Sequence, residues 1–157
     1  MKKPKYRNGQ EEGAKFEDSQ CELLDAAGID YERERLAHSK HTAERSKGKC
    51  DIIVEKECYL ELKSVEKNSM GYKLNPSGPS KGIIIKAHQI AFLYKKWFTE
   101  GKEAGLLLEY RPHKPVYVRI EDFYKFVAQS TAKSITYYDA CIIGCEVDSV
   151  LDIIRSE

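Results

Sequence analysis

Long hydrophobic runs are absent from this 157-residue sequence. No apolar stretch approaches the roughly 18 residues that a membrane-spanning helix requires. The first residues, MKKPKYRNGQEEG, are basic, and no apolar segment follows them, which argues against a secretory signal. We therefore expect a cytoplasmic protein with no membrane partner.

Cysteines are few and odd in number. Their scattered positions are Cys21, Cys50, Cys58, Cys141 and Cys145. Such an arrangement is a poor basis for a disulfide framework, so we expect reduced thiols. The Cys141-x3-Cys145 pair has no second ligand pair of matching spacing, so it is a weak zinc signal, and we expect it to be buried among apolar residues.

A net excess of either charge is also missing, since 26 Lys and Arg face 25 Asp and Glu. With 41% apolar and 32% charged residues, the composition excludes wholesale disorder. The charge is nevertheless unevenly distributed. Residues 33–49 contain six Lys or Arg and two acids, a local charge of +4. This distribution permits a polyanionic partner.

Hydrophobic periodicity predicts one α/β (α+β) domain over residues 1–157, with a central mixed sheet flanked by helices. Expected non-regular segments are a basic N-terminal tail (1–10), a basic loop or short stalk (36–49) and a flexible loop (66–82). Expected helices are Glu11–Ala27, Lys86–Glu100 and Glu121–Ala128. Expected strands are Ile29–Arg35, Asp51–Lys56, Cys58–Ser64, Gly105–Tyr110 and Val116–Ile120.

The hairpin CDIIVEKECYLELKS carries charges where strands usually gather apolar residues. With a turn near Lys56-Glu57, Asp51 would lie opposite residues 62–63, within reach of Glu61 and Lys63. Two carboxylates about 5 Å apart repel by roughly 3 kcal/mol at an effective dielectric near 20. A divalent cation would offset this repulsion, and carboxylate oxygens suit Mg²⁺ or Mn²⁺. The alternative is the solvated face of an edge hairpin, with Lys63 neutralising Glu61.

The spacing D-x9-E-L-K resembles the PD-(D/E)xK nuclease signature. GAKFEDSQCELL is similar to the first helix of RecU-like Holliday-junction resolvases. AHQIAFL, GLLLEY and PVYVRIEDFYKF resemble later elements of that family, so the resemblance runs from about Gly13 to Phe126. It implies a restriction-endonuclease-like fold and a homodimeric, Mg²⁺-dependent, structure-selective endonuclease acting in recombination or repair, with Mn²⁺ as a substitute cation.

The resemblance also implies roles for individual residues. Asp51, Glu61 and the Leu62 carbonyl would coordinate the cation. Glu17 would be a further ligand or would hold a metal-bound water, the alternative being an ordinary helix-surface acid. Lys63 would stabilise the phosphate or position the nucleophile.

A further set of residues is expected to contact DNA: Arg35, Lys40, Arg45, Lys47, Lys49, Lys73, Lys81, His88 and Gln89. Contacts between lysine or arginine and phosphate confer affinity with little sequence preference. His88 and Gln89 begin a helix, where exposed N–H groups favour a phosphate. The alternatives are an ordinary solvated loop for the basic residues and a helix-capping pair for His88 and Gln89. Tyr72 is a candidate for stacking on an unpaired base.

The expected substrate is branched DNA, above all a four-way junction, and a recombinase is a further candidate partner. Two other functions fit the same residues. One is a restriction-like or repair nicking nuclease acting on duplex or flapped DNA. The other is a non-catalytic DNA-binding protein that modulates recombination.

Overall fold

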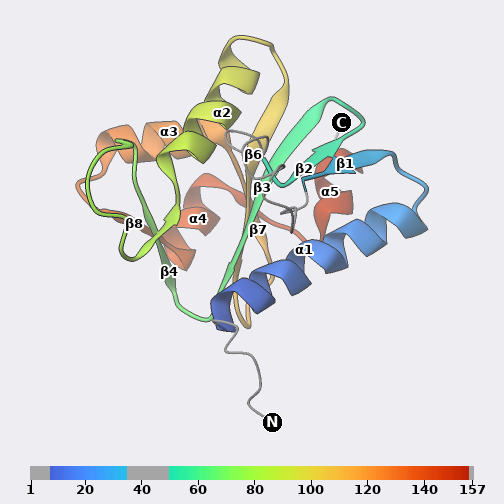
Figure 1. The fold of residues 1–157 in the computed structure, drawn as a ribbon, viewed down its shortest axis with the longest axis horizontal. Helices are drawn as coiled ribbons and strands as arrows, with labels where there is room; N and C mark the ends of the chain where they lie inside the picture. Colours follow the sequence, from blue (N-terminus) through green and yellow to red (C-terminus); the bar gives the residue numbers. More distant parts are fainter. Residues whose placement is uncertain (1–7, 35–49, 156–157) are drawn as a thin grey trace, which may run out of the picture.

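A mixed six-stranded sheet forms the centre of the computed structural model, which describes residues 8–34 and 50–155 (Figure 1). Its strands, in spatial order, are β1 (Tyr31–Arg33), β2 (Ile52–Val54), β3 (Cys58–Val65), β6 (Glu103–Tyr110), β7 (Val116–Arg119) and β9 (Cys145–Glu146). β3 and β6 are parallel, and the other neighbouring pairs of this sheet are antiparallel. The predicted mixed α/β architecture is confirmed.

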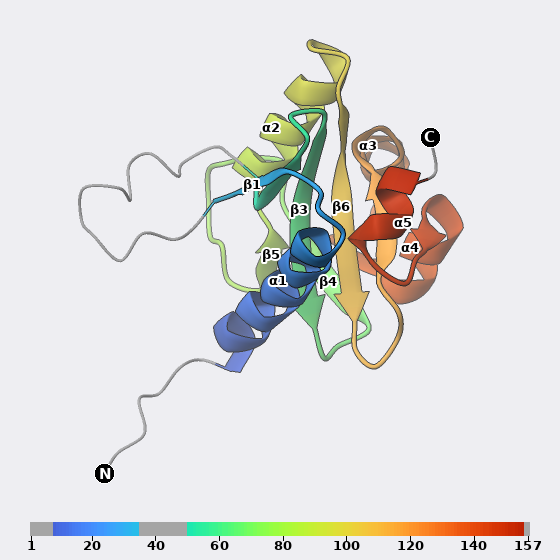
Figure 2. The same ribbon diagram turned by 90° about the vertical axis from the view of Figure 1, so that its right-hand side faces the viewer.

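Helices cover both faces of this sheet (Figures 1 and 2). On one face lie α1 (Asn8–Ala26) and the short α5 (Val150–Arg155). On the other lie α2 (Ala87–Phe98), α3 (Ile120–Gln129) and α4 (Tyr137–Ile143). A small second sheet of β5 (Ile83–Ile85), β4 (Ser69–Tyr72) and β8 (Ser134–Thr136) adjoins the α2 side.

Strand β3 divides the hydrophobic core because its side chains alternate between the two faces. Leu60 and Leu62 pack with Phe16 of α1, whereas Tyr59 packs with the cluster beneath α2. Glu61 and Lys63 have the same parity as Tyr59 and therefore point toward α2. The central parallel strand β6 is apolar on both faces, as expected for a strand covered on both sides.

The β2–β3 hairpin has a different register from the one that the sequence predicts. Ile52 pairs with Leu60 and Val54 with Cys58, around a turn in which Glu55 and Lys56 both have positive φ. The paired residues are symmetric about residue 56, so extending the pairing by one residue places Asp51 opposite Glu61. The predicted placement of Asp51 opposite residues 62–63 is wrong by one to two positions, because the turn begins one residue earlier.

The segment predicted as a loop over residues 66–82 contains strand β4. Met70 and Tyr72 are buried on it, and the Tyr72 hydroxyl donates to the Ala132 carbonyl oxygen at 2.5 Å. Tyr72 is therefore a core residue rather than an exposed base-stacking residue. β4 also passes close to the end of the following loop, since a Cβ at Gly71 would lie 2.4 Å from the Gly82 carbonyl oxygen. Glycine permits that approach.

All five cysteines lie in the described residues, and none of them forms a disulfide there. Cys21 and Cys50 are buried, but Cys145 is exposed on the edge strand β9 and Cys141 is only partly buried. The expected burial of the Cys141–Cys145 pair is therefore wrong for Cys145. Along residues 8–34 and 50–155, no helix combines the length and apolar character needed to cross a membrane.

Candidate active site

The structure brings Asp51, Glu61 and Lys63 together at the start of the hairpin. The Glu61 side chain is almost completely buried, and the Lys63 Nζ lies 3.3 Å from its Oε1 atom. Asp51 lies just before β2, and its Oδ2 atom accepts a hydrogen bond from the Leu62 backbone N–H at 2.8 Å. Because Glu61 is only 1% exposed, a solvated edge hairpin does not describe this cluster.

Glu61 is an unusual residue for a sheet interior. Burial, and then the nearby charge of Asp51, raise its pKa well above the ordinary value, while Lys63 opposes the shift. One of its oxygens, Oε2, is buried and has no hydrogen-bond partner within the part of the chain that the structure describes. A buried carboxylate oxygen without a partner is costly, and a ligand bound to it beside Asp51 would relieve that cost.

Gln89, in the first turn of α2, holds the other oxygen of Glu61. Its Nε2 atom donates to Glu61 Oε1 at 2.6 Å, and its Oε1 atom accepts from the Lys86 backbone N–H at 3.0 Å. The side-chain oxygen of Gln89 therefore caps α2, as the helix-capping alternative predicted. The amide nitrogen additionally reaches into the acidic cluster.

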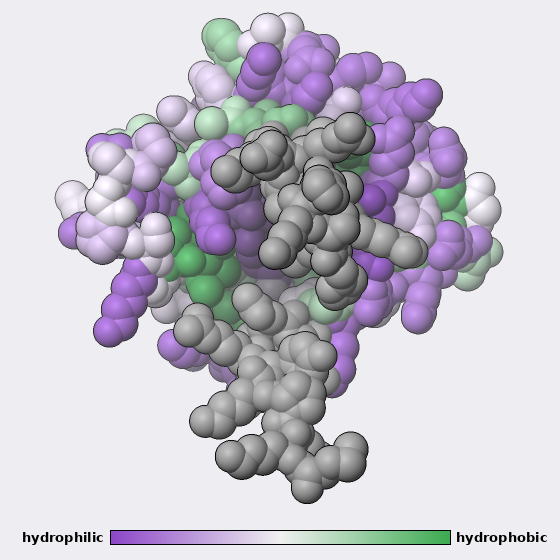
Figure 3. Space-filling model, in the orientation of Figure 1, coloured by the Kyte–Doolittle hydropathy of each residue, from purple (hydrophilic) through white to green (hydrophobic). Residues whose placement is uncertain are grey.

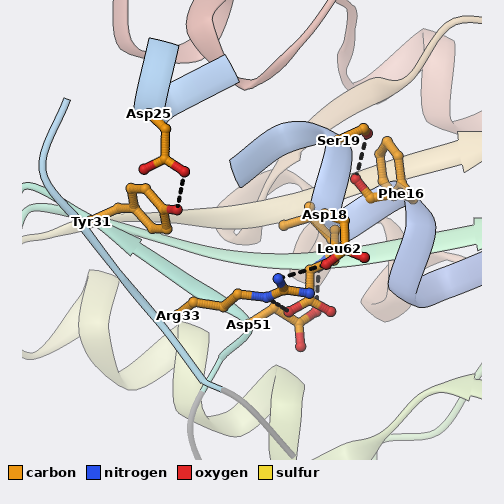
Figure 4. A network of polar contacts seen from close by, with 9 residues as sticks. Phe16, Asp18, Ser19, Asp25, Tyr31, Arg33, Asp51 and Leu62 are labelled. Carbon is orange, nitrogen blue, oxygen red and sulfur yellow. Dashed lines mark hydrogen bonds and ion pairs between the residues drawn. The ribbon is translucent and has the colours of Figure 1, made fainter. Parts of the chain in front are cut away.

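Glu17 lies on α1 and approaches the cluster from the other face of the sheet. Burial, together with the charge of Asp51, raises the pKa of Glu17 to about 7. Arg33 of β1 opposes that shift, and its Nε atom donates to Glu17 Oε1 at 3.1 Å. The same guanidinium forms a second ion pair with the neighbouring Asp18, from Nη1 to Oδ1 at 2.6 Å (Figure 4).

The donor set fits a hard divalent cation. Asp51 and Glu61 are adjacent carboxylates, and the unpaired oxygen of Glu61 is available to a ligand. Across the described ranges, no group of three or more His, Cys, Asp or Glu side chains lies close enough together to hold a metal ion. Asp51 and Glu61 are therefore the two carboxylates that could hold a cation, and Mg²⁺ commonly binds proteins through one or two carboxylates while keeping several waters.

The residues predicted to contact DNA fall into different environments. Arg35, Lys40, Arg45, Lys47 and Lys49 lie outside the described residues. Lys73 donates to the Gly78 and Pro79 carbonyl oxygens, at 2.9 and 3.3 Å, within its own loop. Lys81 is exposed on the same loop.

His88 is exposed at the start of α2, one residue before Gln89. Partial burial, followed by the charges of Lys86 and Lys63, lowers its pKa from the ordinary value. The charges of Lys63 and Lys86 thus both act on His88, and Lys63 also contacts Glu61. Such a group favours an anionic ligand.

Sequence reasoning missed Arg33, Asp18 and Lys86. Lys86 lies two residues before His88 of the predicted His-Gln pair and could have been included from its position alone. The Arg33 ion pairs depend on β1 packing beside α1, which no local pattern reveals. Figure 3 shows that the face of the molecule seen in Figure 1 is mainly hydrophilic, with a smaller hydrophobic area at its lower left.

Comparisons with known proteins bear on the fold. No protein-family profile matches the chain, and no curated protein sequence matches it. One similar solved structure is that of Hjc from Archaeoglobus fulgidus, described as a Holliday junction resolvase from an archaeal hyperthermophile. The two chains are 16% identical with a TM-score of 0.56, and the match covers 87% of this chain and 97% of that one. This likeness establishes that the chain has the fold of that resolvase, and the RecU-like assignment stays a prediction.

Proposed function

We propose that this protein is a Mg²⁺-dependent endonuclease that hydrolyses phosphodiester bonds in branched DNA, with four-way junctions as its principal substrate. The observation that carries the proposal is the Asp51–Glu61 pair, with an unpaired buried oxygen and Lys63 3.3 Å from the same carboxylate. A buried acid pair of this kind is unfavourable in isolation and is relieved by a cation. Mn²⁺ should substitute because it accepts the same oxygen ligands.

Asp51 and Glu61 would hold the cation, with the Leu62 carbonyl as a further candidate ligand. A bound Mg²⁺ would supply charge stabilisation at the phosphate and a more acidic water. Gln89 fixes Glu61 through its amide, and the Leu62 N–H fixes Asp51. Lys63 would place a positive charge where negative charge develops on the phosphate. Glu17, from the α1 side, would be a further ligand of the cation or would hold a water that the cation binds.

The preference for a junction rests on the shared fold with a protein described as a Holliday junction resolvase. Two symmetric cuts across a junction require two active sites, so we propose that the protein acts as a homodimer. Lys81, on the loop before β5, and Lys86 and His88, at the start of α2, are exposed and would contact the DNA backbone. These contacts would provide affinity rather than sequence preference.

The test is incubation with an immobile four-way junction and with linear duplex of the same sequence, with and without Mg²⁺. Paired nicks on opposite strands of the junction alone, only with the cation, are expected. Asp51→Ala should abolish cleavage and leave junction binding intact. Wild-type cleavage rates in Asp51→Ala would refute the site. Equal cleavage of linear duplex would refute junction selectivity while leaving the nuclease chemistry in place.

A further inference from the structure

We infer that Arg33 is a positioning residue for the nuclease site. Arg33 holds the Glu17 carboxylate beside Asp51 by forming ion pairs with two consecutive acids of α1, Glu17 and Asp18. The inference rests on the function proposed above and adds to it a residue that touches none of the proposed reacting atoms. The observation behind it is the forked ion pair, in which Arg33 Nε lies 3.1 Å from Glu17 Oε1 and Nη1 lies 2.6 Å from Asp18 Oδ1. Figure 4 shows Arg33 and Asp18 in contact.

The backbone places Arg33 opposite Ile52, the residue that follows Asp51. Arg33 pairs with Ile52 in the β1–β2 ladder, and the next residue, Glu34, donates its N–H to the Asp51 carbonyl oxygen at 3.0 Å. Strand β1, which carries Arg33, is thus followed directly by a residue that is hydrogen-bonded to Asp51, the first proposed metal ligand. Because Arg33 holds Glu17, the position of the Glu17 carboxylate is fixed relative to Asp51.

Glu17 needs such a restraint because it lies near a like charge. The charge of Asp51 acts on Glu17, and repulsion between the two carboxylates favours rotation of the glutamate toward solvent. The Glu17 side chain is nevertheless only 18% exposed. The Arg33 guanidinium supplies the attraction that keeps it in place.

The ion pair with Asp18 sets the orientation of the Arg33 guanidinium. It is 55% exposed and binds the outer end of the guanidinium, so the inner Nε atom is turned toward Glu17. The planar guanidinium presents several donors in a fixed fork, whereas a lysine ammonium is a single point charge. Lysine at position 33 would keep the charge but could not hold both acids in this geometry.

The experiment measures Mn²⁺ affinity by calorimetry, without DNA, on the full chain. Arg33→Gln is expected to weaken Mn²⁺ binding about tenfold, the scale typical for partners that orient metal ligands. This direction is diagnostic, since loss of a positive charge would by itself strengthen cation binding. In the Glu17→Gln background the same change should have no further effect, because Arg33 acts through Glu17.

Asp25→Asn is the matched control, because Asp25 accepts a hydrogen bond from the Tyr31 hydroxyl at 3.1 Å and so links the same helix and strand away from the site (Figure 4). It should leave Mn²⁺ affinity unchanged. Arg33→Lys should behave like Arg33→Gln. Thermal unfolding of each variant checks that the fold is retained.

Three results would overturn the inference alone: Arg33→Gln binding Mn²⁺ as tightly as wild type or more tightly, additive effects of the Arg33 and Glu17 changes, or full affinity in Arg33→Lys. An equal loss in Asp25→Asn would also overturn it, since Arg33 would then only dock α1. Absence of Mn²⁺ binding by the wild-type protein would instead refute the proposed metal site, and the inference with it.

Discussion

The amide of Gln89 donates to the buried carboxylate of Glu61 at 2.6 Å, across 28 positions of sequence. The same side chain accepts the Lys86 N–H, so one residue joins the first turn of α2 to the acidic cluster. The helix cannot shift without disturbing Glu61. Gln89 therefore belongs with the residues that orient the site, in addition to any contact with DNA.

Gln89→Ala should lower the cleavage rate constant by about 10- to 100-fold, as is typical when the partner of a metal ligand is removed. KM for junction DNA should change little, because the amide faces Glu61 rather than solvent. Single-turnover cleavage and junction binding measure the two quantities separately. His88→Ala is the control, since His88 is exposed next to Gln89 and should affect DNA binding instead. A weakened junction affinity with an unchanged rate constant in Gln89→Ala would contradict this role.

Glu61→Gln should stabilise the metal-free protein at pH 8. The pKa of Glu61 is raised by burial and by Asp51, so ionisation of this group opposes folding. A gain of about 1 kcal/mol corresponds to roughly 3 °C in Tm for a chain of this size. Thermal unfolding in a chelator measures it. Glu57→Gln, at an exposed acid of the same hairpin, should produce no such gain, and an equal gain there would show that only net charge matters.

The stability of the metal-free protein should depend on Glu17 between about pH 4.5 and pH 7. Its pKa is raised to about 7 in the folded state, from an ordinary value of 4.5. Below pH 4.5 the group is protonated in both states, and its contribution to stability is fully present. As pH rises to 7, the unfolded chain releases its proton first, so this contribution is lost.

The measurement is the free energy of unfolding of wild type minus that of Glu17→Gln across this range. The difference should fall steadily from pH 4.5 to 7 and level off above it. A flat difference would mean that the pKa of Glu17 is not raised. Asp25→Asn, at an exposed acid of the same helix, is the control for nonspecific charge effects.

Lys81→Ala should weaken junction binding equally for different sequences and reduce the slope of log K against log salt by about one unit. The reason is that an exposed loop lysine would contact phosphate and release one counterion. Lys73→Ala is the comparison, because Lys73 is bonded to carbonyls of its own loop and should alter the slope less. Filter binding at several salt concentrations provides the slopes. Identical slopes for Lys81→Ala and wild type would exclude Lys81 from the interface.

The sequence determined the elements that depend on local periodicity. The helices starting near Glu11 and Lys86, the β2–β3 hairpin and the β6 and β7 strands all appear close to their predicted bounds. The sequence also determined that Asp51, Glu61 and Lys63 lie near one another, because strand alternation and a short turn fix their relative positions. β4 escaped prediction, since its Gly and Ser resemble loop residues, and it becomes a strand through its pairing with β5 and β8, which buries Met70 and Tyr72.

Tertiary structure decided everything that joins separate elements. Gln89 reaches Glu61 because α2 packs over β3, and Arg33 grips Glu17 because β1 lies beside α1. No spacing in the chain encodes these contacts, since each depends on how two elements pack rather than on either alone. The burial that raises the pKa of Glu61 arises in the same way, from helices covering both faces of the sheet.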